Sequence, residues 1–321
     1  LRQKQARLCV GCNIRKNTKG NNMKRNFSFL ISFLMAVLSL SACQLSGNKK
    51  LADNVISETV SNVLDDNDAS RVTSGEQYQE KSDADGDDAL ASENSSDAAS
   101  PVCGLPKVGK GTPEKILKRF AYTCSFNPVN KIPNWVAWEL TADHADGPYK
   151  RGGIKFQEDE GVTTYDYVRS GYDRGHMCPS GDNKWSEEAQ QQSFLMTNMC
   201  PQVHGLNAGD WNEMEMQCRK WAEEYGKIDI IAGPVLFKGK HKTIGSSRVV
   251  VPEAFFKIVY CPSRKMAIGF IYRNEDGNRP KGDYVNSVAQ VERITGFKFL
   301  TALPEKEAQK IKGEASLSAW Y

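Results

Sequence analysis

The residues of this 321-residue chain that are best suited to chemistry lie in the segment Asp173-Arg174-Gly175-His176. Histidine is the side chain whose ordinary pKa suits proton transfer near neutral pH. Arginine can bind two oxygens of one phosphate group, and glycine lets the backbone approach a ligand without a Cβ clash. The segment therefore predicts proton transfer next to a bound anion.

A second group of polar side chains follows shortly after the first. Asn207 and Glu215 lie eight residues apart in a stretch with helical spacing. Eight residues are two helical turns and a fraction, at ~100° per residue, so both side chains can reach the same region. Arg219 lies one turn beyond Glu215, on the same helix face. An amide oxygen and a carboxylate in one region are suitable ligands for a hard divalent cation.

Taken in order, these residues resemble the DNA/RNA non-specific endonuclease family, the group that contains Serratia nuclease and endonuclease G. The residues that carry the resemblance are Asp173-Arg174-Gly175-His176, Asn198 with Pro201-Gln202, and Leu206-Asn207 with Trp211 and Glu215. The resemblance covers roughly residues 115–305. It implies an α+β chain with the ββα-metal (His-Me finger) nuclease fold, in which a mixed or antiparallel central sheet is flanked by helices.

The resemblance also implies a role for each residue at the substrate. His176 would be the general base, and Arg174 would bind the scissile or a neighbouring phosphate. Arg219 would touch phosphate as well. Asn198 would orient the catalytic residues. Asp173 would belong to the substrate-binding residues. We expect it to position the backbone or Arg174 rather than to bind a metal.

For the metal, the resemblance implies that Asn207 is the direct protein ligand of Mg²⁺, with Mn²⁺ or another divalent cation as an alternative. Magnesium keeps several waters and often has only one or two protein ligands. Glu215 would complete the catalytic set by holding a water of the ion's shell.

Taken singly, each of these residues has an ordinary structural explanation. Asn207 would be a helix N-cap, Glu215 and Arg219 a pair on a helix surface, and His176 a solvated turn residue. Glu213 is a rival of Glu215, and the family spacing favours Glu215. The joint occurrence of the set favours a catalytic site.

The function that follows is hydrolysis of phosphodiester bonds in DNA and RNA with little sequence preference, because contacts to phosphate and sugar carry no base information. Three alternatives stay open from the residues alone. One is the same chemistry restricted to RNA, and another is a surface lipoprotein that binds nucleic acid without catalysis. The third is an inhibitor-paired toxin, against which the expected lipid anchor argues because it opposes release.

Charge is distributed unevenly along the chain. Residues 1–50 carry 10 Lys/Arg and no Asp/Glu, whereas residues 51–100 carry 2 Lys/Arg and 13 Asp/Glu. Residues 101–321 carry 30 Lys/Arg and 26 Asp/Glu. This modest excess of positive charge is compatible with a polyanionic substrate. We expect residues 44–100 to be a solvated, disordered tether and residues 101–321 to form the catalytic domain.

The N-terminal segment has the layout of an export signal. Residues 23–43 begin with basic residues, continue as an apolar run too short for a membrane span of ~20 residues, and end in Leu40-Ser41-Ala42-Cys43. This ending resembles a bacterial lipobox, whose lipidated Cys43 would anchor an exported protein to the outer membrane or cell surface. An ordinary secretory signal is the alternative. Residues 1–22 are expected to be an over-extended reading frame.

The cysteine count suggests disulfides in the expected exported domain. Of the nine cysteines, six fall in residues 101–321: Cys103, Cys124, Cys178, Cys200, Cys218 and Cys261. An even number in an exported domain suggests disulfides. Fifteen pairings are possible, and the one we expect is Cys103–Cys124, Cys178–Cys200 and Cys218–Cys261.

Hydrophobic spacing predicts the elements that must position these residues. Helices are expected over residues 113–122, after an N-cap at Ser186, over 207–225 with Gly226 as the stop, and over 285–294. Strands are expected over residues 134–140, 228–233, 255–260 and 266–272, and residues 193–198 are expected to form a short strand or an extended segment. The resemblance implies that the strand over 134–140 leads into a variable loop over about 143–163. Helices and strands without a strict βαβ alternation fit an α+β fold.

Overall fold

A seven-stranded sheet forms the centre of residues 101–321, the part of the chain that the computed structural model describes. All neighbouring strands pair antiparallel, in the order β1-β2-β3-β6-β9-β10-β11. Their bounds are β1 (Lys115–Lys118), β2 (Thr123–Asn127), β3 (Ile132–Thr141), β6 (Lys227–Val235), β9 (Ala254–Cys261), β10 (Met266–Arg273) and β11 (Val285–Asn286). The expected leader, signal peptide, lipobox at Cys43 and tether all lie outside the described residues.

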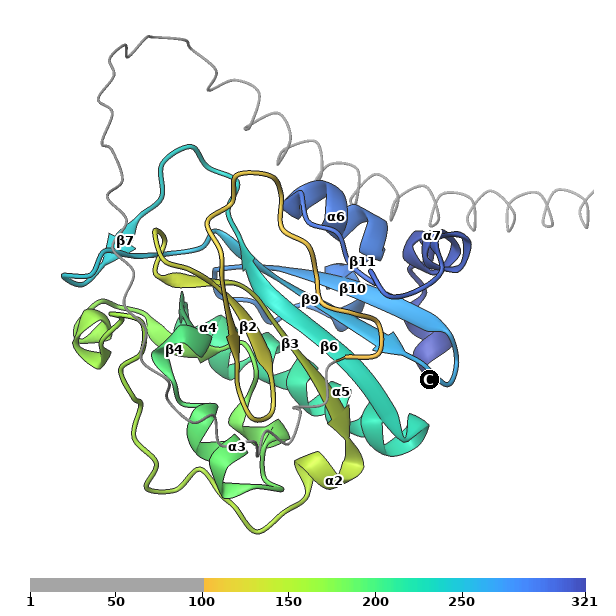
Figure 1. Cartoon of the computed structure of the whole chain (residues 1–321), viewed down its shortest axis with the longest axis horizontal. Helices are drawn as coiled ribbons and strands as arrows, with labels where there is room; N and C mark the ends of the chain where they lie inside the picture. The colour runs from red at the N-terminus through yellow and green to blue at the C-terminus, as the bar shows by residue number, and fades with distance from the viewer. Residues whose placement is uncertain (1–100) are drawn as a thin grey trace, which may run out of the picture. The chain divides into compact units, whose positions relative to one another are not determined.

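Both faces of the sheet are covered because the strands are apolar on both sides. In β3, Val136 and Trp138 point into one core, which Trp211 and Trp221 of α5 complete. Trp135 points into the other core, against which α6 and α7 pack. Figure 1 shows α5 on one side of the sheet and α6 and α7 on the other. The helices are α2 (Ala142–Ala145), α3 (Glu187–Gln192), α4 (His204–Ala208), α5 (Asp210–Tyr225), α6 (Val288–Thr295) and α7 (Glu305–Gly313).

Two small two-stranded sheets and several short turns of 3-10 helix complete the described residues. The sheets pair β4 (Asp173–His176) with β5 (Met199–Gln202), and β7 (Thr243–Ile244) with β8 (Val249–Val250). The 3-10 turns are η1 (Thr164–Tyr167), η2 (Ser180–Asp182), η3 (Met196–Asn198), η4 (Lys281–Tyr284) and η5 (Leu317–Trp320). Within residues 101–321, no helix is long and apolar enough to cross a membrane.

The α+β class is confirmed, and so are the four predicted strands, which correspond to β3, β6, β9 and β10. The predicted helix over residues 113–122 is wrong, because this segment contains the edge strand β1. Ile116 is 44% exposed whereas its neighbour Leu117 is 7% exposed, which is the alternation of a strand. Residues 196–198 form the turn η3 rather than an extended segment.

The other helix boundaries follow capping residues. Ser186 is the N-cap of α3, as expected, and its side chain accepts a hydrogen bond from the Ala189 amide. The stretch 207–225 is two helices, because the backbone breaks at Gly209, and Gly226 ends the second at a positive φ of 81°. The helix expected over 285–294 begins only after its N-cap Ser287.

The three expected disulfides are wrong, since all six cysteines of the described residues are free and buried. Cys103 lies in the core on one side of the sheet and Cys124 in the core on the other side, so these two cannot meet. The Cys124 thiol instead donates to the Thr197 carbonyl. Burial raises the pKa of Cys218 to about 12, which keeps that thiol protonated at neutral pH.

Candidate active site

The strand β4 carries the whole Asp173–His176 segment and pairs with β5 in a short antiparallel ladder. Gly175 lies opposite Cys200, and a Cβ at Gly175 would lie 2.7 Å from the Cβ of Gln202. Only glycine therefore fits at this position. The close approach of β5 fixes the strand from which His176 projects.

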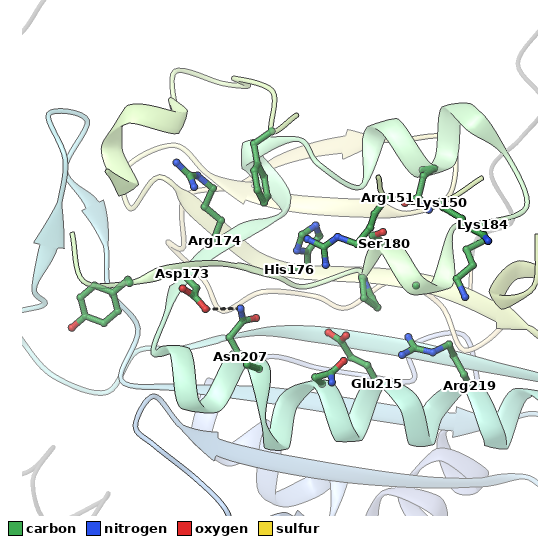
Figure 2. Close-up of a pocket in the computed structure, with 17 residues that line it drawn as sticks. Lys150, Arg151, Asp173, Arg174, His176, Ser180, Lys184, Asn207, Glu215 and Arg219 are labelled. Carbon is green, nitrogen blue, oxygen red and sulfur yellow. Dashed lines mark hydrogen bonds between the residues drawn. The ribbon is translucent and has the colours of Figure 1, made fainter. Parts of the chain in front are cut away.

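A pocket of about 780 Å³ lies between β4, the loop before it, η2, and the helices α4 and α5. Its cationic lining residues are Lys150, Arg151, Arg174, Lys184 and Arg219. Its anionic lining residues are Asp173 and Glu215. Figure 2 shows Lys150, Lys184 and Arg219 at one end and Arg174 toward the other, with His176 between them. The excess of positive charge suits a polyanion.

His176 lines the middle of this pocket, and its ring packs against the rings of Phe156 and Phe194, whose centroids lie 5.7 and 5.1 Å away. Burial and, second, the positive charge of Arg151 lower the pKa of His176 to about 3. The imidazole is therefore neutral at neutral pH and can accept a proton. Its Nε2 is buried without a partner, which leaves Nδ1 as the ring nitrogen available to the pocket.

Asn207 faces the pocket from α4, and its orientation is set by Asp173. The Asn207 Nδ2 donates a hydrogen bond of 2.9 Å to Asp173 Oδ2, shown as a dashed line in Figure 2. Because the nitrogen side of the amide is engaged, its Oδ1 remains as an acceptor. The same Asp173 oxygen lies 2.8 Å from Nδ1 of the exposed His204. Asp173 thus positions Asn207, whereas we expected it to position the backbone or Arg174.

Glu215 lines the pocket from α5, six residues beyond the break at Gly209. Burial raises the pKa of its carboxyl to about 7, although the ammonium of Lys257 acts in the opposite direction. Lys257 is itself buried in β9, with its Nζ 4.1 Å from the centre of the Trp211 ring.

Arg219 is bound by a carboxylate other than Glu215. Its Nη1 donates to Asp182 Oδ1 at 2.8 Å, and Trp138 Nε1 donates to the other oxygen at 3.1 Å. Asp182 is buried beneath the pocket in η2. The guanidinium of Arg219 is therefore fixed at the pocket wall by a partner that sequence reasoning did not identify.

Arg174 lines the pocket as expected, and three groups fix its guanidinium. Its Nη2 donates to the Thr164 carbonyl at 2.7 Å, and its Cζ lies 5.1 and 5.7 Å from the ring centres of Phe156 and Tyr167. The guanidinium is therefore restricted in orientation at the pocket wall.

Asn198 lies behind the pocket wall and does not line it. It is fully buried, and its Oδ1 accepts the Cys178 amide while its Nδ2 donates to the carbonyls of Cys178 and Ser193. These bonds fix the chain just after His176. The Asn198 side chain thus holds the backbone that follows His176 and does not reach the pocket.

The pocket residues fit a hard divalent cation. The described residues contain no group of three or more His, Cys, Asp or Glu that could hold a metal ion. The pocket instead offers the Oδ1 of Asn207 and the carboxylate of Glu215. Such a sparse set of oxygen donors suits Mg²⁺, which keeps most of its waters.

Sequence reasoning missed Lys150, Arg151 and Lys184 at the pocket, and Lys257 beneath it. Lys150 and Arg151 lie in the loop that we expected to be variable, where their signal was two adjacent cations before two glycines. Lys257 could have been noticed as a single charge within an apolar strand.

The antiparallel sheet, the β4–β5 pair with His176 and the helix with Glu215 have the arrangement of the ββα-metal fold. A family model for DNA/RNA non-specific endonucleases matches residues 105–306, and the chain belongs to this family.

Named relatives agree with this assignment. The chain is 32% identical to mitochondrial nuclease EXOG of Danio rerio over 226 residues, which cover 61% of this chain and 65% of EXOG. It is 32% identical to nuclease C1 of Cunninghamella echinulata var. echinulata, covering 60% of this chain and 85% of that protein. A chain in the crystal structure of the EndoG/EndoGI complex superposes with a TM-score of 0.59 at 26% identity, over 66% of this chain and 94% of that chain. The chain spans less than two thirds of the length of the EXOG relatives.

Proposed function

We propose that the chain is a metal-dependent endonuclease that hydrolyses phosphodiester bonds in DNA and RNA without sequence preference. The observation that carries the proposal is the neutral His176 facing the same cationic pocket as the oriented amide oxygen of Asn207. The family and the names of the relatives support the class of reaction.

In the proposed reaction, His176 Nδ1 accepts a proton from a water molecule while the water oxygen forms a bond to phosphorus. The bond from phosphorus to the 3′ oxygen breaks, and this oxygen takes a proton from solvent. Arg174 and Arg219 bind non-bridging phosphate oxygens in fixed orientations. A divalent cation, Mg²⁺ or Mn²⁺, supplies positive charge to the phosphate and the leaving oxygen. Asn207 would hold it directly, and Glu215 would hold it through water.

The lack of sequence preference follows from the groups that line the pocket. Its charged residues are suited to phosphate, and phosphate contacts carry no sequence information. A site that makes no use of the 2′-hydroxyl accepts both polymers. Cleavage of matched DNA and RNA duplexes at similar rates would support this, whereas cleavage of RNA alone would favour the narrower substrate.

We also propose that the protein is exported and anchored to the outer membrane or cell surface through a lipid on Cys43. The layout of residues 23–43 supports this proposal. Labelling of cells with a radioactive fatty acid should mark the chain, and Cys43→Ser should abolish the label. Labelling that persists in Cys43→Ser would refute the anchor.

The experiment that tests the nuclease is plasmid nicking by the full-length chain with Mg²⁺, with EDTA, and with His176→Ala. We expect nicking that needs the metal and is lost in the variant. Nicking that survives His176→Ala would refute the proposed base. Binding of the plasmid without nicking, in the presence of Mg²⁺ or Mn²⁺, would favour a nucleic-acid-binding protein without catalysis.

A further inference from the structure

The segment between β6 and β9 is strongly basic. We call residues 238–248 the basic arm; the segment 237–252 that contains it has no acidic residue. Lys238, Lys240, Lys242 and Arg248 are exposed, and none of the four forms a salt bridge within the described residues. Cations that lack a carboxylate partner are free to bind an external anion.

The basic arm is anchored to the body of the protein by two carboxylates beneath it. Glu253 accepts the Phe237 amide and lies 3.0 Å from His241 Nδ1. Asp166 accepts the Ser247 amide at 2.9 Å. Although burial alone would raise the pKa of Asp166, hydrogen bonds from Ser247 and Thr163 lower it. The negative charges therefore lie at the base, and the positive charges face outward.

The basic arm is continuous with the candidate active site. Lys242 Nζ lies 3.3 Å from the Tyr172 hydroxyl and 4.8 Å from the centre of the Tyr172 ring. Tyr172 lines the pocket and directly precedes Asp173 and Arg174. In Figure 1, β7 lies on the side of the molecule where β4 lies, whereas α7 lies at the opposite side. The arm thus extends the pocket beyond Arg174.

We propose that the basic arm binds the sugar-phosphate backbone of nucleic acid beyond the pocket. A strand would run from Lys150 and Lys184 at one end, past His176, to Lys242 at the other end. This rests on the proposed function and deepens it, because the site would then bind a long polymer more tightly than a short one. The contact between Lys242 and Tyr172 favours nucleic acid over a membrane surface, since it joins the arm to the pocket.

The test is metal-free binding of the full-length chain to a fluorescent 40-base-pair DNA duplex, followed in EDTA over a range of salt concentrations. The variant is Lys238→Gln/Lys240→Gln/Lys242→Gln. Each lost phosphate contact lowers the steepness of log affinity against log salt by about 0.9, so three contacts lower it by about 2.7. The dissociation constant at physiological salt should rise roughly tenfold or more.

The matched control is Lys110→Gln/Lys306→Gln/Lys310→Gln, which removes the same charge from exposed lysines. Lys306 and Lys310 lie on α7, away from β7 in Figure 1. The control should keep the salt dependence of the unmodified chain. An equal decrease in the salt dependence of duplex binding in both variants, or no decrease in the arm variant, overturns the proposal. It is also overturned if the arm variant loses binding to vesicles of anionic phospholipid while duplex binding is unchanged.

Plasmid nicking separates this inference from the nuclease itself. Nicking by the unmodified chain together with an unchanged salt dependence in the arm variant would refute the basic arm and keep the enzyme. A reduced salt dependence in a chain that never nicks would keep the arm as a nucleic-acid-binding surface and refute the enzyme.

Discussion

Glu215 should make the metal-free protein less stable as the pH rises. The folded pKa of its carboxyl is about 7, against an ordinary value of 4.5, because burial penalises the charged form. The folded state therefore binds more protons than the unfolded state between these two values. The stabilisation is fully present below pH 4.5 and is lost as the pH rises through 7. Glu215→Gln, which resembles the protonated form, should lack this dependence.

The expected size follows from the two pKa values. A difference of about 2.5 units corresponds to about 3 kcal/mol at most. Because the Glu215 carboxylate lines a pocket, solvent screens part of this penalty. We therefore expect the free energy of unfolding to change by on the order of 2 kcal/mol. The assay is urea unfolding of the full-length chain and of Glu215→Gln in EDTA, at intervals from pH 4.5 to 8. The free energy of unfolding of the unmodified chain should fall relative to the variant as the pH rises.

His176 should give a pH dependence of stability with the opposite sign in the same assay. Its pKa is lowered from 6.5 to about 3, so the folded state binds fewer protons than the unfolded state between these values. The stability that depends on neutral His176 is present above pH 6.5 and is lost as the pH falls toward 3. The free energy of unfolding of the unmodified chain should therefore fall relative to that of His176→Gln as the pH becomes acidic. A difference between Glu215→Gln and the unmodified chain that is independent of pH, or that has the sign expected for His176, would refute the reasoning for Glu215.

Two further substitutions test how the site is built. Asp173→Ala removes the acceptor that orients the Asn207 amide, so the Mg²⁺ concentration for half-maximal plasmid nicking should rise about 10–100-fold. His204→Gln, which removes only the exposed partner of Asp173, should change it by less than about threefold, and an equal effect of both would contradict this role of Asp173. Gly175→Ala should lower the free energy of unfolding by about 1–3 kcal/mol in urea titration, since the new Cβ would lie 2.7 Å from a cross-strand Cβ. Gly152→Ala, with no atom within 4 Å, should stay within about 0.5 kcal/mol, and similar losses in both would show that crowding is not the cause.

The parts of the fold that could be predicted from the sequence are the long apolar strands. β9 contains aromatic and β-branched residues on both faces, and its type follows from composition alone. β1 was missed because its four residues are too few to distinguish a strand period from a helix period. Its conformation is set by pairing with β2, where Leu117 faces Cys124. Such pairing is a tertiary contact that a local pattern does not contain.

The sequence placed His176, Asn207 and Glu215 in one region, and all three line the pocket, but their supporting contacts could not be predicted. The types and order of His176, Asn207 and Glu215 indicated a hydrolytic site because they resemble those of the DNA/RNA non-specific endonuclease family. The carboxylate that orients Asn207 lies 34 residues before it, and the one that binds Arg219 lies 37 residues before it. Pairs at such separations depend on how β4 and η2 pack against α4 and α5, which spacing along the chain does not reveal.

These contacts divide the pocket into a fixed centre and an adaptable flank. The guanidinium of Arg219 and the amide of Asn207 are each bound by a carboxylate, and His176 packs against two aromatic rings. Lys150 and Lys184 line the same pocket without a salt bridge to any described residue. Bond cleavage requires groups in fixed positions, whereas long lysine side chains can follow a phosphate backbone of variable shape. Substitutions in the centre should therefore reduce turnover, and substitutions in the flank should weaken binding.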